Sequence, residues 1–305
     1  MPESIKNRSE ILFLYDVKDA NPNGDPIDEN KPRIDEETGV NIVTDVRLKR
    51  TIRDYLYEHK GLEVFIREIR KEDGTPKSKE DRIKDIGFDS ILEKCIDIRL
   101  FGSTTAVKKQ RIVLTGPVQF KYGRSLHKVD LTLIRGTTVM PSDEGRQQGT
   151  FTERYILPYS LIVFYGVVNE NAAQTQNIPL NEEDINLMIE GIWNGTKNLI
   201  SGSKFGQMPR LLLQVVYKEK QDFHIGELDK LISLKTELND EAIRDISDVK
   251  VDLTPLINKL RQHKDKIDRI RFKQDDRITL LKDGNELKLS EILNEFPNEE
   301  LNFLS

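Results

Sequence analysis

The fold is decided near the N-terminus, where the apolar run Ile11-Leu-Phe-Leu-Tyr-Asp-Val leads into the turn-rich segment Asp19-Ala-Asn-Pro-Asn-Gly-Asp-Pro. The run carries large residues on both of its faces, which predicts a buried central strand. The segment after it favours turns, because Gly and Asn accept positive φ and Pro fixes its own. A loop this long is uncommon as a plain connection, so we interpret it as a binding loop.

The loop is followed by Asn41-Ile-Val-Thr-Asp-Val-Arg-Leu-Lys-Arg-Thr-Ile-Arg. We predict that a cation-rich helix begins within this stretch, with Thr44 or Asp45 as its cap. The start of a helix offers unpaired backbone N–H groups, and cations just beyond it suit phosphate groups. The candidate phosphate contacts are Arg47, Lys49, Arg50 and Arg53. Three of them recur at intervals of three residues, which places them on one helix face. The alternative is that all four are ordinary solvent-exposed helix positions.

Bulk composition indicates a globular protein of one or two domains. The chain has 305 residues, of which 37% are hydrophobic and 32% charged. No apolar run approaches the ~20 residues that span a bilayer, and the first residues contain no apolar signal core. The single cysteine, Cys95, excludes an internal disulfide framework and a cysteine-based metal cluster. We therefore expect a cytoplasmic protein with no membrane partner.

Charge is segregated along the chain, although the net charge is −5. Residues 99–155 hold ten Lys and Arg against four Asp and Glu, whereas residues 19–40 hold two against seven. A mildly acidic protein with a basic middle can still bind a polyanion, because local potential governs capture. The alternative is that the charges alternate over solvated faces.

The order of predicted elements is strand, helix, strands, helix, strand. Strands are expected at 11–17, 64–69, 111–122, 129–135, 155–168 and 211–217, and helices from Val46, from Ser90 to Leu100 and from Asn181. This order predicts an α+β fold of the split βαβ type, as in ferredoxin-like and RRM folds. No Gly-rich phosphate loop follows a strand, so a Rossmann fold is excluded. Residues 219–305 are expected to form an appended α/β region packed on the core, with a hairpin at Asp283-Gly284.

Metal and nucleophile chemistry find little support. The four histidines lack metal-ligand spacing, and prolines interrupt the faint calcium-loop pattern of residues 19–28, so we predict no metal and no cofactor. Cys95 lies within an apolar helical stripe and is expected to be a core residue. His127, close to Arg124 in the sequence, leaves open a metal-independent ribonuclease site, with a polar strand connection as the alternative.

More residues are candidates for RNA binding than for metal binding or catalysis. Besides the helix cations we nominate the turn at Phe101, Gly102 and Ser103, whose backbone N–H groups can face phosphates. A second Gly-rich basic turn spans residues 202–210 and precedes the last core strand. The remaining nominated residues are Asn21, Asn23, Gln119, Arg124, Thr137, Thr138, Met140, Lys204, Gln207 and Arg210. The RNP1 sequence is missing, so base stacking on the sheet in the RRM manner is not expected.

Five motifs in order resemble those of the CRISPR-associated Cascade backbone subunits, the seventh Cas family, and subtype I-B is the nearest type. They are Asp-Ala-Asn-Pro-Asn-Gly-Asp-Pro (19–26), Val-Thr-Asp-Val-Arg-Leu-Lys-Arg (43–50), Asp97-Ile-Arg-Leu-Phe-Gly, Thr115-Gly-Pro-Val-Gln-Phe and Phe205-Gly-Gln-Met-Pro-Arg. The resemblance runs from about residue 8 to residue 218.

The resemblance implies a modified RRM palm with a finger-like insertion at 70–95 and a thumb β-hairpin at 136–154, so that residues 1–218 form the core. It further implies that copies polymerise head to tail along CRISPR RNA beside other Cascade subunits, and that the guide pairs with target DNA in antiviral defence. Related backbone subunits of type III effectors cut target RNA with an early-loop Asp. Asp25 or Asp28 would take that role in the alternative function, whereas the motif resembles the type I pattern, which implies no enzyme.

Overall fold

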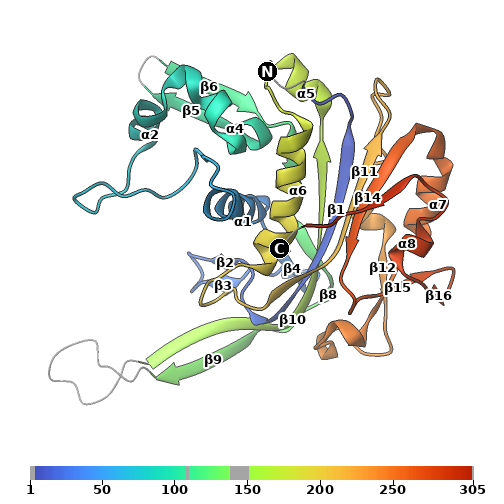
Figure 1. The fold of residues 1–305 in the computed structure, drawn as a ribbon. Coiled ribbons are helices and arrows are strands. Elements are labelled where there is room, and N and C mark those ends of the chain that lie inside the picture. Colours follow the sequence, from blue (N-terminus) through green and yellow to red (C-terminus); the bar gives the residue numbers. More distant parts are fainter. Residues whose placement is uncertain (1–3, 108–109, 138–150, 304–305) are drawn as a thin grey trace.

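The computed structural model describes residues 4–107, 110–137 and 151–303. Within these residues the largest sheet has nine strands, and its main path runs β17-β14-β11-β1-β10-β8-β4 (Figure 1). The bounds are β1 Ser9–Ala20, β4 Val40–Val43, β7 Val118–Phe120, β8 Gly123–Lys128, β9 Thr132–Thr137, β10 Phe151–Val168, β11 Gln207–Tyr217, β14 Ile267–Gln274 and β17 Asn298–Glu300. Helices and sheet are mixed in one fold, so the predicted α+β class is confirmed.

Strand β1 lies at the centre of this sheet, as its apolar run predicts. It pairs antiparallel with β10 on one side (Phe13 opposite Phe164) and with β11 on the other (Phe13 opposite Leu212). Beyond β10, strand β8 pairs antiparallel through Ser125 and Ile162. Neighbouring residues of a strand point to opposite faces, so β1 sends Phe13 to one face and Leu12 and Leu14 to the other.

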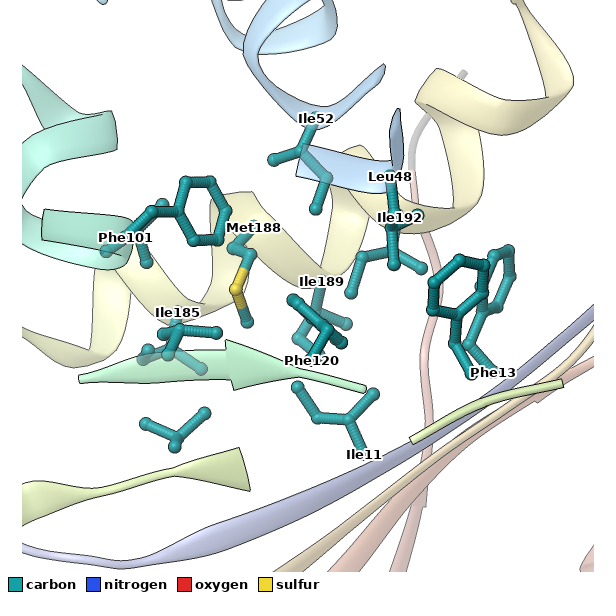
Figure 2. Packing of buried hydrophobic residues seen from close by; sticks show 14 of the residues in the cluster. Ile11, Phe13, Leu48, Ile52, Phe101, Phe120, Ile185, Met188, Ile189 and Ile192 are labelled. Atoms are coloured by element: carbon teal, nitrogen blue, oxygen red, sulfur yellow. The ribbon is translucent and has the colours of Figure 1, made fainter. Parts of the chain in front are cut away.

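Two helices cover the first face, and Figure 2 shows their contacts with β1. Helix α1 (Asp45–Glu58) contributes Leu48 and Ile52, and α6 (Glu182–Lys197) contributes Met188 and Ile192. Helix α6 begins with a capping box in which the Asn181 side chain accepts a hydrogen bond from the Asp184 backbone N–H at 3.0 Å. The positions of α1 and α6 are therefore fixed by apolar packing on the central strands.

Residues 219–303 cover the opposite face, so neither face of the central strands is open to a ligand. The covering elements include β12 (Ser233–Lys235), β13 (Lys250–Asp252), α7 (Thr254–Gln262), β15 (Thr279–Lys282), β16 (Asn285–Glu286) and α8 (Leu289–Ile292). Strands β14 and β17 of the same segment extend the sheet itself. Leu256, Ile257 and Leu260 of α7 belong to the same buried cluster as Leu12 and Leu14. The predicted hairpin at Asp283-Gly284 is confirmed, with positive φ at both residues, as a tight two-residue turn requires.

Residues 62–107 form a separate lobe with its own small core of Phe65, Ile83, Ile91 and Cys95. The lobe contains α2 (Lys79–Ile86), α3 (Ile91–Lys94), α4 (Ile96–Phe101) and the start of the hairpin β5 (Gly102–Val107) with β6 (Gln110–Thr115). The predicted strand at 64–69 is wrong, because the Asp97 carboxylate, and not a neighbouring strand, accepts hydrogen bonds from the backbone N–H groups of Phe65 and Ile66 at 2.7 and 3.1 Å.

Strand β9 pairs with the first part of β10 to form a hairpin that leaves the body of the sheet (Figure 1). Short strands β2 (Gly24–Asp25) and β3 (Lys31–Pro32) pair beside the base of this hairpin, and α5 (Glu170–Thr175) follows β10 at its far end. No helix in the described parts of the chain is long and apolar enough to cross a lipid bilayer.

Candidate nucleic-acid interface

The loop between β1 and α1 is held in place by its two nominated asparagines. Asn21 is buried, with its side-chain N–H on the Asn30 carbonyl at 2.6 Å and its backbone N–H on the Ser203 carbonyl at 2.7 Å. The Oδ1 of Asn23 accepts hydrogen bonds from the Thr44 backbone N–H and hydroxyl at 2.8 and 2.9 Å, just before α1 begins. Both asparagines therefore shape the loop and fix the start of the helix.

Three of the four helix cations are paired with carboxylates, and the phosphate contacts nominated for them stay predictions. Lys49 is buried and contacts the Asp45 carboxylate at 2.8 Å, and the Asp54 carboxylate accepts hydrogen bonds from Arg50 at 2.6 and 2.8 Å. Arg53 is buried and contacts Asp97, which is fully buried, at 2.8 Å. Lys49 and Arg50 pair with carboxylates one turn away on the same helix, whereas Arg53 pairs with a carboxylate of the lobe formed by residues 62–107.

Arg47 differs from the other three. Its guanidinium donates to the Thr51 hydroxyl at 3.0 Å, and no carboxylate among the described residues forms an ion pair with it. Burial lowers the pKa of Arg47 and the nearby Arg50 lowers it further, while the Asp54 carboxylate offsets these effects only in part. A half-buried cation without a counter-ion is costly, so this position favours an anionic ligand.

Lys204 lies beside Arg47 although the two are far apart in the sequence. Burial lowers the pKa of Lys204, and the positive charge of Arg47 lowers it further. The Lys204 ammonium contacts the Ser203 hydroxyl at 3.3 Å and forms no ion pair within the described chain. We call Arg47 and Lys204 the cation pair. Two half-buried cations that repel each other are stabilised when an anion such as a phosphate lies between them.

An open groove of about 690 Å³ is lined on one side by loop 201–206, the loop that carries Lys204. We call it the hairpin groove. Its walls are the β1–α1 loop, the base of the β9–β10 hairpin and loop 201–206. The Arg154 guanidinium of the hairpin donates a hydrogen bond to the Gly202 carbonyl of loop 201–206 at 3.2 Å. The Tyr155 hydroxyl of the hairpin donates to the Glu29 carboxylate of the β1–α1 loop at 3.0 Å. The lining consists of Asp19, Asn21, Glu29, Asn30, Ile134, Glu153, Arg154, Tyr155, Ile156, Ser201, Gly202, Ser203 and Phe205.

Phe205 is the feature of this groove that the sequence analysis missed. Its ring is 76% exposed, which is unusual for a large aromatic residue, and it directly follows Lys204. Gly206, with φ of +103°, follows it, and a Cβ there would lie 2.8 Å from the Lys18 carbonyl oxygen. The sequence does contain one indication of a stacking surface, which is a single aromatic residue between Gly202 and Gly206 in a basic turn.

The nominated turn at Phe101, Gly102 and Ser103 does not offer free backbone donors. All three residues are buried, and Gly102 and Ser103 begin β5, opposite Thr115 and Leu114 of β6. The Phe101 ring lies beneath cations of α1, with its centroid 5.2 Å from the Arg53 guanidinium carbon. Strand pairing and packing use the turn, and the RNA contact nominated for it stays a prediction.

Four further nominated residues are distributed over distant parts of the sheet. Arg210 is buried between the Asp16 and Asp275 carboxylates, which excludes contact with a ligand, and Gln207 is buried at the start of β11. Arg124 is exposed but pairs with Asp35 at 2.9 Å. Gln119 is opposite Val167, at the end of β10 away from the hairpin groove, and donates to the Gly116 carbonyl.

Thr137 is the last residue of β9, opposite Phe151 of β10. Thr138 and Met140 lie outside the described residues, as does most of the predicted thumb at 136–154. These nominations stay predictions.

The residues considered for catalysis are occupied by structural contacts. Asp25 pairs with Arg33 at 2.5 Å and Asp28 with Lys31 at 2.7 Å. His127 is buried, its Nδ1 bonds to the Lys128 carbonyl at 2.7 Å, and its Nε2 accepts the Leu161 backbone N–H at 3.2 Å. No group of three or more His, Cys, Asp or Glu residues suited to a metal ion occurs in the described ranges.

Comparison with known proteins identifies the family. The family model of CRISPR-associated protein Cas7 matches residues 7–254. A CRISPR-associated protein Cas7 from Haloferax volcanii is 35% identical over 309 residues, covering 90% of this chain and 88% of the relative. A chain of a CRISPR RNA-guided surveillance complex has a similar fold (TM-score 0.53, 13% identity, 88% and 89% coverage of the two chains). A second such chain, from a complex described as pre-nicking, gives a TM-score of 0.57 at 12% identity over 97% and 96% of the chains. The chain therefore belongs to the Cas7 family of CRISPR-associated proteins.

Proposed function

We propose that this protein is a CRISPR RNA-binding backbone subunit of a type I Cascade surveillance complex. The cation pair carries the proposal, because Arg47 and Lys204 are half-buried, the charge of Arg47 lowers the pKa of Lys204, and neither has a counter-ion among the described residues. A phosphate of a single-stranded guide supplies the missing negative charge. Family membership supports the same conclusion, since the relatives of similar fold come from RNA-guided surveillance complexes.

The hairpin groove gives the bound strand its path. Phe205 presents an exposed aromatic face beside Lys204, so a base can stack on the ring while the adjacent phosphate contacts the cations. Stacking and phosphate contacts do not depend on base identity, as a holder of variable guides requires. Of the three groove carboxylates, Glu153 pairs with Arg135 at 2.9 Å, and Glu29 shares Lys31 with Asp28, which reduces repulsion of the strand.

The arrangement of strands and helices supports a palm of the RRM type whose sheet faces are not used. Strands β11-β1-β10-β8 are antiparallel neighbours, α1 follows β1, and α6 connects β10 with β11, as in the split βαβ arrangement. Both faces are covered, so the guide must run along the edge formed by the β1–α1 loop and loop 201–206. In this proposal residues 70–95 act as fingers and residues 136–154 as a thumb, and copies assemble head to tail along the guide.

We propose a structural rather than a catalytic role. A nuclease of the type III kind would need an early-loop carboxylate that is free to act on its target, whereas Asp25 and Asp28 each contact a cation of the same loop, Arg33 and Lys31. Incubation of the purified protein with a single-stranded target RNA complementary to its guide tests this point. Intact target RNA supports the proposal, and cleavage that disappears in D25N or D28N would support the endoribonuclease.

The direct test of the proposed function is the RNA that the protein carries when it is isolated from its host. We expect small RNAs of uniform length in which one spacer is flanked by repeat sequence, and we expect their spacers to pair with foreign DNA. Recovery of random transcript fragments, or of no RNA, would contradict the proposal.

A further inference from the structure

A second group of unneutralised cations lies at the end of the sheet opposite the hairpin groove. We call Lys218, Lys220, Lys264 and Lys266 the lysine patch. Lys218 and Lys220 follow β11, and Lys264 and Lys266 precede β14, which pairs antiparallel with β11. Figure 1 shows these two connections at the upper right, away from the β9–β10 hairpin. Strand β11 separates Lys204 from Lys218, and its 11 residues span roughly 35 Å when extended.

The two turns are fixed against each other. The backbone N–H of Lys218 donates to the Lys266 carbonyl at 2.9 Å, and the Lys218 ammonium donates to the Asp265 carbonyl at 2.6 Å. The Lys266 ammonium lies 3.9 Å from the centroid of the Phe223 ring, and that of Lys264 lies 5.7 Å from the centroid of Phe296. A cation over an aromatic ring keeps its full charge, so these contacts place the lysines without neutralising them.

None of the four lysines forms an ion pair with a carboxylate in the described chain. Neighbouring cations do, since Arg8 contacts Asp222 at 2.8 Å and Arg261 contacts Glu295 at 2.8 Å. Glu219 and Asp265 lie between the lysines, and Asp222, which pairs with Arg8, follows Lys220, so four lysines face three carboxylates in a chain whose net charge is −5. Lys218, Lys220 and Lys264 are solvent-exposed.

We propose that the lysine patch binds the phosphate backbone of a second nucleic-acid strand or duplex, separate from the strand in the hairpin groove. The patch has no exposed large apolar residue, whereas the buried core of a protein–protein interface is more apolar than the rest of the surface. Ammonium groups without such a centre are suited to phosphates, which they bind as point charges. Because both sheet faces are covered, a strand in the hairpin groove has no direct path to the patch. The inference does not depend on the identity of the strand in the groove.

The test uses the full-length protein freed of nucleic acid and then saturated with unlabelled single-stranded RNA. Fluorescence anisotropy then measures binding of a labelled DNA duplex and, separately, of a second labelled single-stranded RNA. The patch variant is K218E/K220E/K264E, and the matched control with the same charge change is K79E/K230E/K288E, at exposed lysines elsewhere. The groove variant R47E/K204E completes the set.

We expect the RNA-loaded wild type and the matched control to bind at least one of the two labelled probes, with affinity that falls steeply as salt rises. The patch variant should bind that probe at least about tenfold more weakly and with a smaller salt slope, since fewer counterions are released. Whichever probe binds identifies whether duplex DNA or single-stranded RNA is the source of the phosphates. In the RNA-free protein, the patch variant should bind the first RNA within about threefold of wild type.

Equal binding by the patch variant and the control would overturn the inference while leaving the proposed function intact. The inference would also be overturned if the patch variant lost as much affinity for the first RNA as for the labelled probe. The lysine patch would then bind the same strand as the hairpin groove. The groove variant should lose the first RNA in either case. If it does not, the proposed function fails independently of the patch.

Discussion

Arg47 and Lys49 are two residues apart on the same helix, yet only Arg47 has charge available for a ligand. The sequence correctly predicts the helix and its cations, because periodic apolar residues and a cap are local signals. It cannot predict their partners, because Asp97, which neutralises Arg53, is 44 residues away in the chain. Lys204 likewise comes near Arg47 only in the folded chain, where loop 201–206 lies against the β1–α1 loop through the Asn21–Ser203 hydrogen bond.

At the scale of single residues, F205A should weaken single-stranded RNA binding without reducing stability. Loss of one stacked base costs about 1–3 kcal/mol, or roughly 5- to 150-fold in affinity. The ring is 76% exposed, so its removal leaves the core unchanged. RNA titration with F205A measures the effect, and Y122A, at another exposed aromatic residue, is the control. Equal affinities of the two variants would show that the ring is not a stacking surface.

His127 should make stability fall in acid. Burial lowers the pKa of His127, and the hydrogen bond to the Lys128 carbonyl offsets part of that effect. Nε2 accepts the Leu161 backbone N–H, which only the neutral ring can do. The unfolded chain therefore binds the proton more readily, so stability is fully present above the unfolded value of about 6.5 and is lost as the pH falls through the folded-state pKa. Urea unfolding between pH 7.5 and pH 5 measures this loss.

The variant H127Q should show a flatter response to pH over that range, because a neutral amide cannot take up the proton. H224Q, at an exposed histidine, serves as the control and should behave like wild type. An unchanged pH profile in H127Q would assign the acid sensitivity to other groups.

At the scale of elements, α1 is joined to the lobe of residues 62–107 by the buried Arg53–Asp97 pair. Asp97 also holds the backbone of residues 65 and 66, which is why an apolar segment with strand propensity forms no strand. This outcome was beyond sequence reasoning, because a buried carboxylate from another helix competes with strand pairing only once the lobe has folded.

Replacement of Arg53 by Ala should lower the free energy of unfolding by about 3–5 kcal/mol, because it leaves Asp97 as an unpaired buried charge. Replacement of Arg50, whose pair with Asp54 is solvent-exposed, should cost at most about 1 kcal/mol. Urea denaturation of both variants makes the comparison. Similar small costs at the two positions would show that the Arg53 pair does not anchor the helix.

At the scale of the whole molecule, residues 219–303 belong structurally to the sheet that they cover. The fully buried Glu10 carboxylate of β1 accepts hydrogen bonds from the Tyr165 and Tyr217 hydroxyls and from the backbone N–H groups of Ile225 and Gly226. The sequence predicts that β1 is buried on both faces and that an appended region packs on the core. It does not predict this contact, because a Glu within an apolar strand gives no signal of four distant donors.

The variant E10Q should detach the segment around residues 223–227 from the sheet. An amide offers one acceptor oxygen to four donors, so at least two donors lose a partner at about 1–3 kcal/mol each. Hydrogen exchange of the backbone N–H groups of Ile225 and Gly226 should accelerate, and stability should fall. E219Q, at an exposed glutamate, is the control. Unchanged exchange at both positions would mean that Glu10 does not hold the segment.

The central claim is that the cation pair binds the guide backbone, and the salt dependence of RNA binding in R47E/K204E tests it most directly. The control R50E/K84E makes the same charge change at two paired, exposed cations. Two lost charge-assisted contacts of about 1.5 kcal/mol each predict roughly 100-fold weaker binding, with a salt slope smaller by about 0.7 per lost phosphate. The control should bind as wild type does. Equal affinities and equal slopes for the two variants would contradict the account.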